Sequence, residues 1–284
     1  MTSEKVKCVP HCRFQPEKAG FVDDMKKAVD NGVAESSTTR RLPSIEEQRT
    51  FWNWHWQNVE SRKVLNDWSE RRAQTMLALI RGLSLSNPRM LDFGCGQGWF
   101  TERLAELGEA HGIDLSTEGI AAAKARRPDI NYVAGSVYNT ALPTGYFDVL
   151  VSSEVIAHVE NQDRYVERAA ELLNPGGYLI VTTGNKFVMD RLGDVGWAVQ
   201  PPQHIARQLS RGQLRKLLLR KRFTVLKSFT IIPHGQRGIL RFINSFRLNS
   251  LLSAVVPQQN LNALKEKMGL GWQMIFLAQK KADA

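Results

Sequence analysis

Apolar and polar residues alternate in two different rhythms between residues 88 and 183. Short apolar runs typical of buried strands come before longer segments in which apolar residues recur every three or four positions, and this unit repeats. The predicted strands are Met90–Phe93, Ala110–Asp114, Ile130–Val133, Phe147–Ser152 and Gly177–Thr183, and the predicted helices are Trp99–Leu107, Thr117–Arg127 and Asp163–Leu173. Strands and helices that alternate in this way predict a parallel sheet with helices on both faces.

The segments outside this core have different patterns. Residues 1–48 have little apolar periodicity, so we expect a flexible arm with at most one short helix over 21–30. Residues 49–87 contain few helix breakers and predict a helical cap. The α/β domain is expected to span 88–284, with insertions at about 184–209 and 231–271 and further elements at Ser210–Lys221, Phe223–Thr230 and Gln273–Ala278.

The segment MLDFGCGQGWF carries the first chemical signal. An apolar strand runs directly into Gly94, Gly96 and Gly98, and a helix is predicted to follow them. Such a turn lets a ligand lie against the backbone, and the start of the helix leaves N–H groups free for its polar atoms. A dinucleotide-binding loop needs glycine where this chain has Trp99. Asp92, just before the loop, would repel a pyrophosphate but can hold an ammonium group, which favours S-adenosylmethionine over NAD.

A second carboxylate stands at the end of the next predicted strand. Asp114 lies 22 residues after Asp92, in the sequence GIDLS. An acid at this spacing commonly accepts hydrogen bonds from the ribose hydroxyls of a bound nucleoside. The alternative is that Asp114 or Ser116 caps the following helix. The glycine loop upstream favours ribose binding.

These motifs resemble the class I S-adenosylmethionine-dependent methyltransferases, especially the small-molecule group that includes the ubiquinone-biosynthesis O-methyltransferases. The resemblance covers about residues 88–183 and rests on LDFGCGQGWFTERLAELG, GIDLS, FDVLVSSEVIAHV and LLNPGGYLIVTT, in this order. It implies an α/β, Rossmann-like fold with a seven-stranded, mostly parallel sheet, helices on both faces and an antiparallel last strand at Gln273–Ala278. It also implies an enzyme with S-adenosylmethionine as its cofactor.

The resemblance further implies a set of cofactor-binding residues. Asp92 and the glycine loop would hold the methionine moiety, and Asp114 would hold the ribose. Leu115 would pack on the adenine, whose edge would lie at Ser136 and Val137. Many relatives carry an aspartate where this chain has Ser136, so its hydrogen bond to the adenine amine would lack charge assistance. The full predicted set is Asp92, Phe93, Gly94, Cys95, Gly96, Gly98, Asp114, Leu115, Ser136, Val137 and Ser153.

Two histidines are the candidates for catalysis. Methyl transfer needs an aligned nucleophile and often a base, and histidine titrates near neutrality. His158 is predicted to act as a base or to order its loop, and it would share a helical face with Glu154. His204 is predicted to face the acceptor or to begin a helix. Relatives that bind a divalent metal have a further acid where this chain has Ala157, so no metal is expected.

An aromatic cluster precedes the core. Trp52 and Trp56 are four residues apart in a predicted helix and would share one of its faces. Related enzymes lay an N-terminal helix over the cofactor, so this face is predicted either to close the pocket as a lid or to form part of the core.

The net charge of +10 comes from one segment. Residues 195–264 contain eleven Lys or Arg and no Asp or Glu, whereas the rest of the chain has 27 basic and 28 acidic residues. Such a segment favours an anionic partner, or is a solvated basic face. Within it, RGILRFINSFRLNSLLSAVV combines Leu, Ile and Phe with Arg, as a helix at a membrane surface does, with a substrate lid as the alternative.

The predicted activity is O-methylation of a small-molecule, sugar or lipid-linked acceptor. The acceptor can be anionic, because the basic segment 195–264 would attract a negative charge. One alternative is a nucleic-acid methyltransferase that uses residues 195–264, which is less favoured because aromatic residues are not interleaved with the basic ones. The other is a membrane-associated lipid or quinone methyltransferase.

Composition bears on the location of the protein. Three cysteines do not make a disulfide framework, and Cys8, His11 and Cys12 supply too few ligands for zinc. The sequence has neither a long apolar run nor a signal-peptide pattern. We therefore expect a cytoplasmic protein. Contact with the membrane surface from the cytoplasmic side is an alternative that this location leaves open.

Overall fold

The computed structural model describes residues 41–58, 67–191, 204–235, 237–253 and 255–282. All of them except Arg41 belong to one compact unit, Leu42–Ala284, and the fold given below is that of this unit. Most of the predicted arm, including its predicted helix over 21–30 and the three potential zinc ligands, lies outside the described residues. Residues 192–203 of the first predicted insertion also lie outside them.

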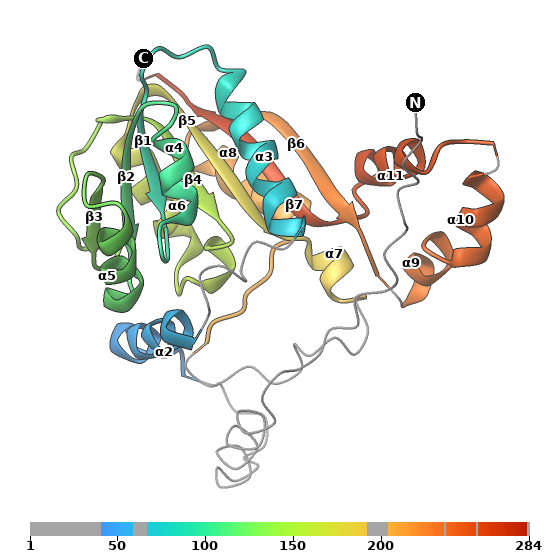
Figure 1. Cartoon of the computed structure of the whole chain (residues 1–284), viewed down its shortest axis with the longest axis horizontal. Coiled ribbons are helices and arrows are strands. Elements are labelled where there is room, and N and C mark those ends of the chain that lie inside the picture. The colour runs from blue at the N-terminus through green and yellow to red at the C-terminus, as the bar shows by residue number, and fades with distance from the viewer. Residues whose placement is uncertain (1–40, 59–66, 192–203, 236, 254, 283–284) are drawn as a thin grey trace, which may run out of the picture. The chain divides into compact units, whose positions relative to one another are not determined.

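Seven strands form one sheet (Figure 1). They are β1 (Arg89–Phe93), β2 (Glu109–Asp114), β3 (Asn131–Ala134), β4 (Phe147–Ser153), β5 (Leu173–Gly184), β6 (Phe223–Pro233) and β7 (Gly271–Lys280). Their order is β3-β2-β1-β4-β5-β7-β6. Strands β1 to β5 pair in parallel, whereas β7 lies antiparallel between β5 and β6. The predicted fold class, with its antiparallel last strand, is confirmed.

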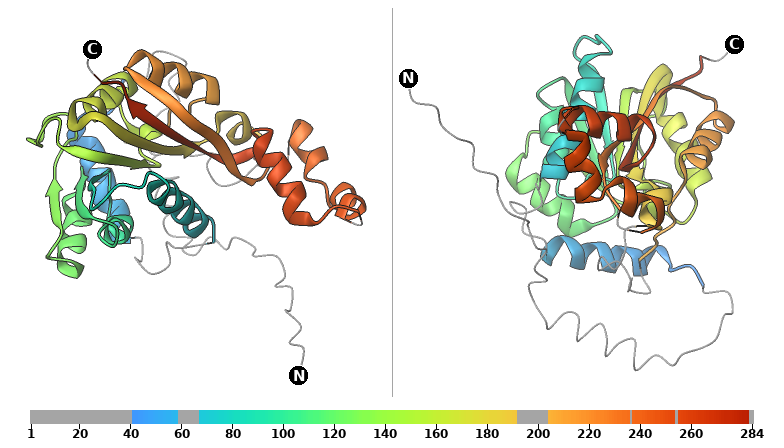
Figure 2. Two further views of the ribbon diagram at one scale, coloured as in Figure 1. Left: turned by 90° about the horizontal axis from the view of Figure 1, so that it is seen from above. Right: turned by 90° about the vertical axis from the view of Figure 1, so that its right-hand side faces the viewer.

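Helices cover both faces of the sheet (Figure 2). They are α2 (Ile45–Asn58), α3 (Asp67–Arg81), α4 (Trp99–Leu104), α5 (Thr117–Arg126), α6 (Gln162–Leu172), α7 (Lys186–Met189), α8 (Arg211–Arg220), α9 (Gly238–Ile243), α10 (Phe246–Ser253) and α11 (Gln258–Lys267), with a short 3-10 helix, η1 (Ile156–His158). Helices α3 and α4 pack on one face, and α6 and α8 pack on the other.

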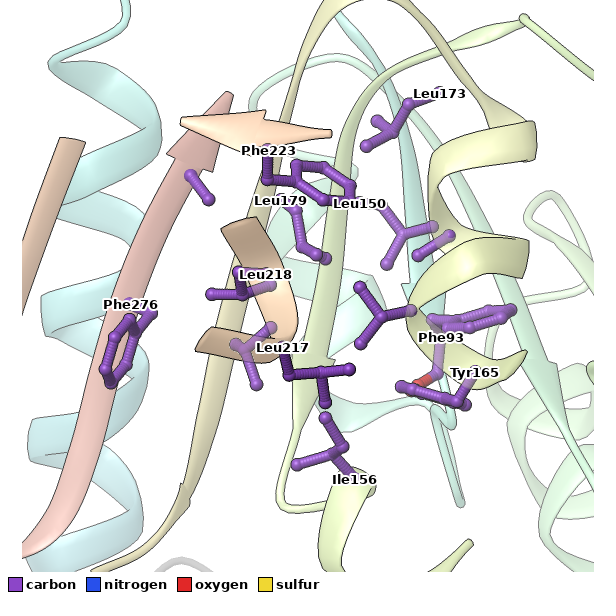
Figure 3. Packing of buried hydrophobic residues seen from close by; sticks show 14 of the residues in the cluster. Phe93, Leu150, Ile156, Tyr165, Leu173, Leu179, Leu217, Leu218, Phe223 and Phe276 are labelled. Carbon is purple, nitrogen blue, oxygen red and sulfur yellow. The ribbon is translucent and has the colours of Figure 1, made fainter. Parts of the chain in front are cut away.

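The sequence of β1 explains how the two faces are built. Successive side chains of a strand point to opposite faces. Met90 therefore packs under α3 and α4, while Leu91 and Phe93 join the core beneath α6 and α8. Figure 3 shows Phe93 within this second core. Asp92 lies on the same face as Met90, where it meets Thr101 of α4. The alternation thus places one carboxylate next to the last residue of β1, on the face of the sheet that Met90 shares.

Some boundaries differ from the predicted ones. Helix α2 begins at Ile45, four residues before the predicted cap, because Ser44 and Glu47 form a capping box in which each backbone N–H donates to the other side chain. The predicted insertion 231–271 contains three helices, α9, α10 and α11. Within the described part of the chain, no helix has both the length and the apolar character needed to cross a membrane.

Candidate active site

A cavity of about 450 Å³ lies at the carboxyl ends of β1, β2 and β4. Its walls come from the loops that follow these strands, from η1, and from α2 and α3. The carboxyl ends of parallel strands are the usual place for ligands in such sheets. The lining includes eight predicted cofactor residues and both predicted catalytic histidines: Asp92, Gly94, Cys95, Asp114, Leu115, Ser136, Val137, Ser153, His158 and His204.

The other three predicted cofactor residues lie behind the lining. The ring of Phe93 is buried in the core against Tyr165, whose hydroxyl lies 2.9 Å from the Phe93 carbonyl oxygen (Figure 3). Gly98 has a φ of 77° and precedes the first residue of α4. Gly96 has a φ of 55°, and the ring of Trp56 lies directly over its Cα. These residues shape and support the loop, and the glycines allow its left-handed turns.

Asp92 is a buried carboxylate at the cavity wall. It accepts a hydrogen bond of 2.7 Å from the Thr101 hydroxyl. Burial raises the pKa of Asp92 to about 7, even though the hydrogen bond from Thr101 acts in the opposite direction. A cationic group placed beside Asp92 would favour its charged form, so this position suits a positively charged ligand.

Asp114 connects the end of β2 to the glycine loop. Its carboxylate accepts hydrogen bonds from the backbone N–H groups of Gly96, at 2.7 Å, and Ser116, at 2.8 Å. Burial raises the pKa of Asp114, and these backbone hydrogen bonds lower it in part. The cap of α5 is Ser116, whose side chain accepts from the N–H of Gly119. Capping therefore belongs to Ser116, and the carboxylate of Asp114 is left to hold the loop and face the cavity.

Helix α2 closes one side of the cavity with aromatic side chains. It is fixed by Asn53, which accepts a hydrogen bond of 2.8 Å from the Ser116 hydroxyl, and by Gln97, which donates one of 2.9 Å to the carbonyl of Trp56. The predicted lid residues, Trp52 and Trp56, both face the cavity. The full set of cavity-lining aromatic residues from α2 is Phe51, Trp52, His55 and Trp56.

His158 has a fixed tautomer. Its Nδ1 lies 2.7 Å from the carbonyl oxygen of Ile205, and because a carbonyl only accepts hydrogen bonds, Nδ1 carries the proton. In the neutral ring, Nε2 then has a lone pair. Burial lowers the pKa of His158, an effect that the Ile205 hydrogen bond and the charge of Glu154 partly oppose. The ring can therefore accept a proton through Nε2 at neutral pH.

Two further histidines surround His158. The ring of His204 lies 4.7 Å from that of His158, and its buried Nδ1 has no hydrogen-bond partner in the described residues. Burial lowers the pKa of His204 to about 3, with smaller effects from the charges of His158 and His55. Burial also lowers the pKa of His55. His55 was not among the residues predicted from the sequence, although it lies within the aromatic cluster of Trp52 and Trp56.

Arg72 of α3 is a second cavity residue that sequence analysis missed. Its Nη1 lies 4.0 Å from Oε1 of Glu154, and its buried Nε has no hydrogen-bond partner in the described residues. Glu154 itself has a φ of 61° and accepts a hydrogen bond from the Thr182 hydroxyl. Arg72 lies in α3, which comes before β1 in the sequence, so only the packing of α3 on the sheet brings its side chain to the cavity. Its guanidinium offers a site for an anionic ligand group.

The chemistry of the cavity suits a ligand with groups of both charges. In the described part of the chain, Asp92 and Asp114 have no basic partner, while Arg72 has an unused donor. Burial raises the pKa of the Cys95 thiol well above its usual value, so this residue stays protonated and is a poor nucleophile. Among the described residues, no group of three or more His, Cys, Asp or Glu side chains is placed to hold a metal ion.

Comparison with known proteins places this site in context. Residues 91–181 match a family model described as a methyltransferase domain. A ubiquinone biosynthesis O-methyltransferase from Chelativorans sp. is 34% identical over 129 residues, which cover 44% of this chain and 49% of that protein. A protein of the same name from Bradyrhizobium sp. is 30% identical over 174 residues, which cover 55% of this chain and 67% of that protein. The chain spans about half the length of several of these relatives.

The solved structure of an N-methyltransferase from Bradyrhizobium japonicum, in complex with S-adenosyl-L-homocysteine, superposes with a TM-score of 0.57. The sequences are 17% identical, and the match covers 84% of this chain and all of the other. The likeness is one of fold.

Proposed function

Because the chain belongs to the class I S-adenosylmethionine-dependent methyltransferases, we propose that it is an enzyme that methylates a hydroxyl group of a small-molecule, sugar or lipid-linked acceptor. Its cofactor is S-adenosylmethionine. The observation that carries the proposal is that one cavity joins the buried carboxylate of Asp92, the half-buried carboxylate of Asp114 and the glycine loop to His158. The choice of oxygen as the methylated atom is supported by the relatives named O-methyltransferases.

The residues of the cavity fit this cofactor. S-adenosylmethionine carries an ammonium, a sulfonium, a carboxylate and two ribose hydroxyls. Asp92 would hold the ammonium, which would offset the unfavourable burial of this carboxylate. Asp114 would accept the ribose hydroxyls, and Arg72, through its unused Nε, would hold the methionine carboxylate.

The adenine would occupy the side of the cavity lined by Leu115, Ser136 and Val137. Leu115 and Val137 offer apolar contact to the ring. Ser136 accepts a hydrogen bond of 3.3 Å from the backbone N–H of Tyr138 and has a hydroxyl that can also accept from the adenine amine. The hydrogen bond between Ser136 and the adenine amine would lack the charge assistance that an aspartate gives, as predicted from the sequence.

When bound, the cofactor supplies an electrophilic methyl group on its sulfonium. The residues of the chain would do the rest. The aromatic side chains of α2 would exclude water from the cavity. His158 would take the proton of the acceptor hydroxyl on Nε2, since the carbonyl of Ile205 keeps the other proton on Nδ1. His204, whose neutral ring lies 4.7 Å from that of His158, would orient the acceptor.

The acceptor class is tested by transfer of label from methyl-tritiated S-adenosylmethionine into a bacterial extract that is then separated by class. We expect label in the lipid or small-molecule fraction. Label confined to nucleic acid would contradict the proposed acceptor and favour the alternative that uses the basic segment. The cytoplasmic location stays a prediction that fractionation of cells would test.

The role of His158 is tested with the labelled fraction as acceptor. The His158→Gln variant should lose roughly 10²–10⁴-fold in rate, which is the usual contribution of a general base. His234→Gln is the matched control, because His234 is half-buried against Trp68 and does not line the cavity. Equal rates for the two variants would remove His158 from the mechanism.

A further inference from the structure

One surface outside the cavity is both apolar and basic. Of the fourteen large apolar side chains that are exposed in the described chain, seven lie between residues 239 and 268. They are Ile239, Phe242, Leu251, Leu252, Val255, Leu264 and Met268. We call α9, α10 and α11, with the turns between them, the α9–α11 surface. Apolar clusters of this kind mark interaction sites, because a protein surface rarely gathers them without a partner.

The α9–α11 surface lies at one end of the sheet, beyond β6 and β7 (Figures 1 and 2). Helix α9 is anchored there by Leu240, which is buried against Val188, and α11 by Leu261. Helix α10 has no buried side chain among its described ones, and its Leu251 is 74% exposed. Val255, just after it, is 86% exposed. The anchors therefore hold α10 in place while its Leu251 and Leu252 stay exposed.

The charge of the α9–α11 surface is positive. Arg241 and Arg247 are exposed, and neither has a carboxylate partner among the described residues. The only acid between residues 231 and 271 is Glu266, which is turned toward the domain. Its side chain is 14% exposed, pairs with Arg71 at 2.7 Å, and accepts a hydrogen bond from the N–H of Ile232. The surface thus carries exposed arginines and no exposed carboxylate.

Other basic residues of the segment 195–264 are used within the domain. Arg220 pairs with Asp163 at 2.6 Å, and Lys221 lies 3.6 Å from Glu167. Arg207 donates to the carbonyl oxygen of Glu160. The charge excess of the segment is therefore not uniform along it. The arginines of the α9–α11 surface stand out because Arg241 precedes the exposed Phe242 in α9 and Arg247 lies four residues before the exposed Leu251 in α10.

We propose that the α9–α11 surface binds a lipid bilayer that contains anionic lipids. Its apolar side chains would enter the headgroup region, and Arg241 and Arg247 would contact lipid phosphates. Helices that lie in a bilayer interface combine these two features. A second copy of the chain would bring an identical positive surface opposite this one, and a nucleic acid would leave Leu251 and Val255 without an apolar partner. A bilayer alone satisfies both the charge and the apolar side chains.

Co-sedimentation of the full chain with vesicles tests this proposal without any methyl donor, so its result is separate from that of the proposed function. We expect binding to vesicles of phosphatidylcholine mixed with phosphatidylglycerol, weaker binding to phosphatidylcholine alone, and a loss of affinity as salt is added. The Leu251→Ser/Leu252→Ser variant should lose most of the binding. The Arg241→Ser/Arg247→Ser variant should lose about fivefold in affinity for each arginine, the equivalent of about 1 kcal/mol.

Two matched controls keep the test specific to this surface. Leu219→Ser/Leu226→Ser removes two leucines that are each 46% exposed on α8 and β6, and Arg215→Ser/Lys216→Ser removes two exposed charges of α8. Both controls should bind vesicles like the parent, and thermal unfolding checks that every variant folds.

Two results would overturn the proposal. The parent chain could fail to bind anionic vesicles, or the control variants could lose as much binding as the surface variants. If the parent does not bind vesicles, two further measurements identify the partner. Conversion of a dimer into a monomer by Leu251→Ser/Leu252→Ser would assign the surface to a second copy, and loss of binding to a short duplex by Arg241→Ser/Arg247→Ser would assign it to nucleic acid.

Discussion

The contact between Gly96 and Trp56 holds α2 over the glycine loop, and the Gly96→Ala variant tests it. Gly96 has a φ of 55°, a left-handed conformation that costs a residue with a Cβ about 1–2 kcal/mol. The added Cβ would lie 2.7 Å from Cη2 and 2.8 Å from Cε2 of Trp56, and nearer still to Cζ2. Overpacking of this kind costs about 1–3 kcal/mol more. The free energy of unfolding should therefore fall by about 2–5 kcal/mol.

Gly145→Ala is the matched control for the backbone effect. Gly145 has a φ of 60°, and a Cβ there would meet no atom within 4 Å, so only the conformational cost applies. Urea unfolding of both variants gives the difference that belongs to the contact with Trp56. In a Trp56→Ala background, Gly96→Ala should cost no more than Gly145→Ala, because the ring that it strikes is gone. Equal losses for the two glycine variants in the parent background would refute the packing of α2 on the loop.

Three other substitutions test the remaining parts of the site. Asp114→Asn removes the charge that would accept the ribose hydroxyls and leaves one of the two backbone donors, the N–H groups of Gly96 and Ser116, unpaired. The Kd for S-adenosylmethionine, measured by calorimetry, should therefore rise roughly 10–100-fold. Asp129→Asn, at an exposed ion pair, is the control and should leave this Kd unchanged. Arg72→Met should raise the Kd for S-adenosylmethionine by a similar factor but leave the Kd of 5′-methylthioadenosine, which has no carboxylate, unchanged. Equal effects on both ligands would contradict the assignment of Arg72 to the methionine carboxylate. Arg71→Met, on the exposed side of α3, is the control. Burial holds the pKa of His204 at about 3 in the folded chain, whereas the value in the unfolded chain is near 6.5. As pH falls, the unfolded chain therefore binds the proton first. The stability that neutral His204 contributes is full above pH 6.5 and is lost progressively below it. Between pH 7.5 and 5 the parent should lose about 2 kcal/mol more than His204→Phe in urea unfolding, and parallel pH profiles would show that His204 is not buried as described.

The parts of the fold that depend on local sequence were predicted correctly, and local sequence also led to the two cavity aspartates, whose roles stay a prediction. Buried parallel strands are mostly apolar and are bounded by turns, so β1, β2 and β4 could be located from short apolar runs between turn residues. Asp92 and Asp114 were found because each interrupts the apolar pattern at a strand end. The start of α2 was missed even though the signal, Ser44 followed three residues later by Glu47, is present in the sequence.

Residues that reach the cavity from distant helices could not be predicted in this way. Arg72 looks like one of several surface charges on α3, and only the packing of that helix on β1 and β4 turns it inward. The carbonyl that fixes the tautomer of His158 belongs to Ile205, 47 residues away, and no local pattern links the two. Such contacts follow from tertiary packing, which neither periodicity nor motif spacing records.

The central claim, that the cavity holds S-adenosylmethionine, is tested most directly by calorimetric titration of the full chain with this cofactor. We expect saturable binding of one molecule per chain, competition by S-adenosylhomocysteine, and weaker binding by the Asp114→Asn variant. The absence of saturable binding, or an affinity that Asp114→Asn leaves unchanged, would contradict it.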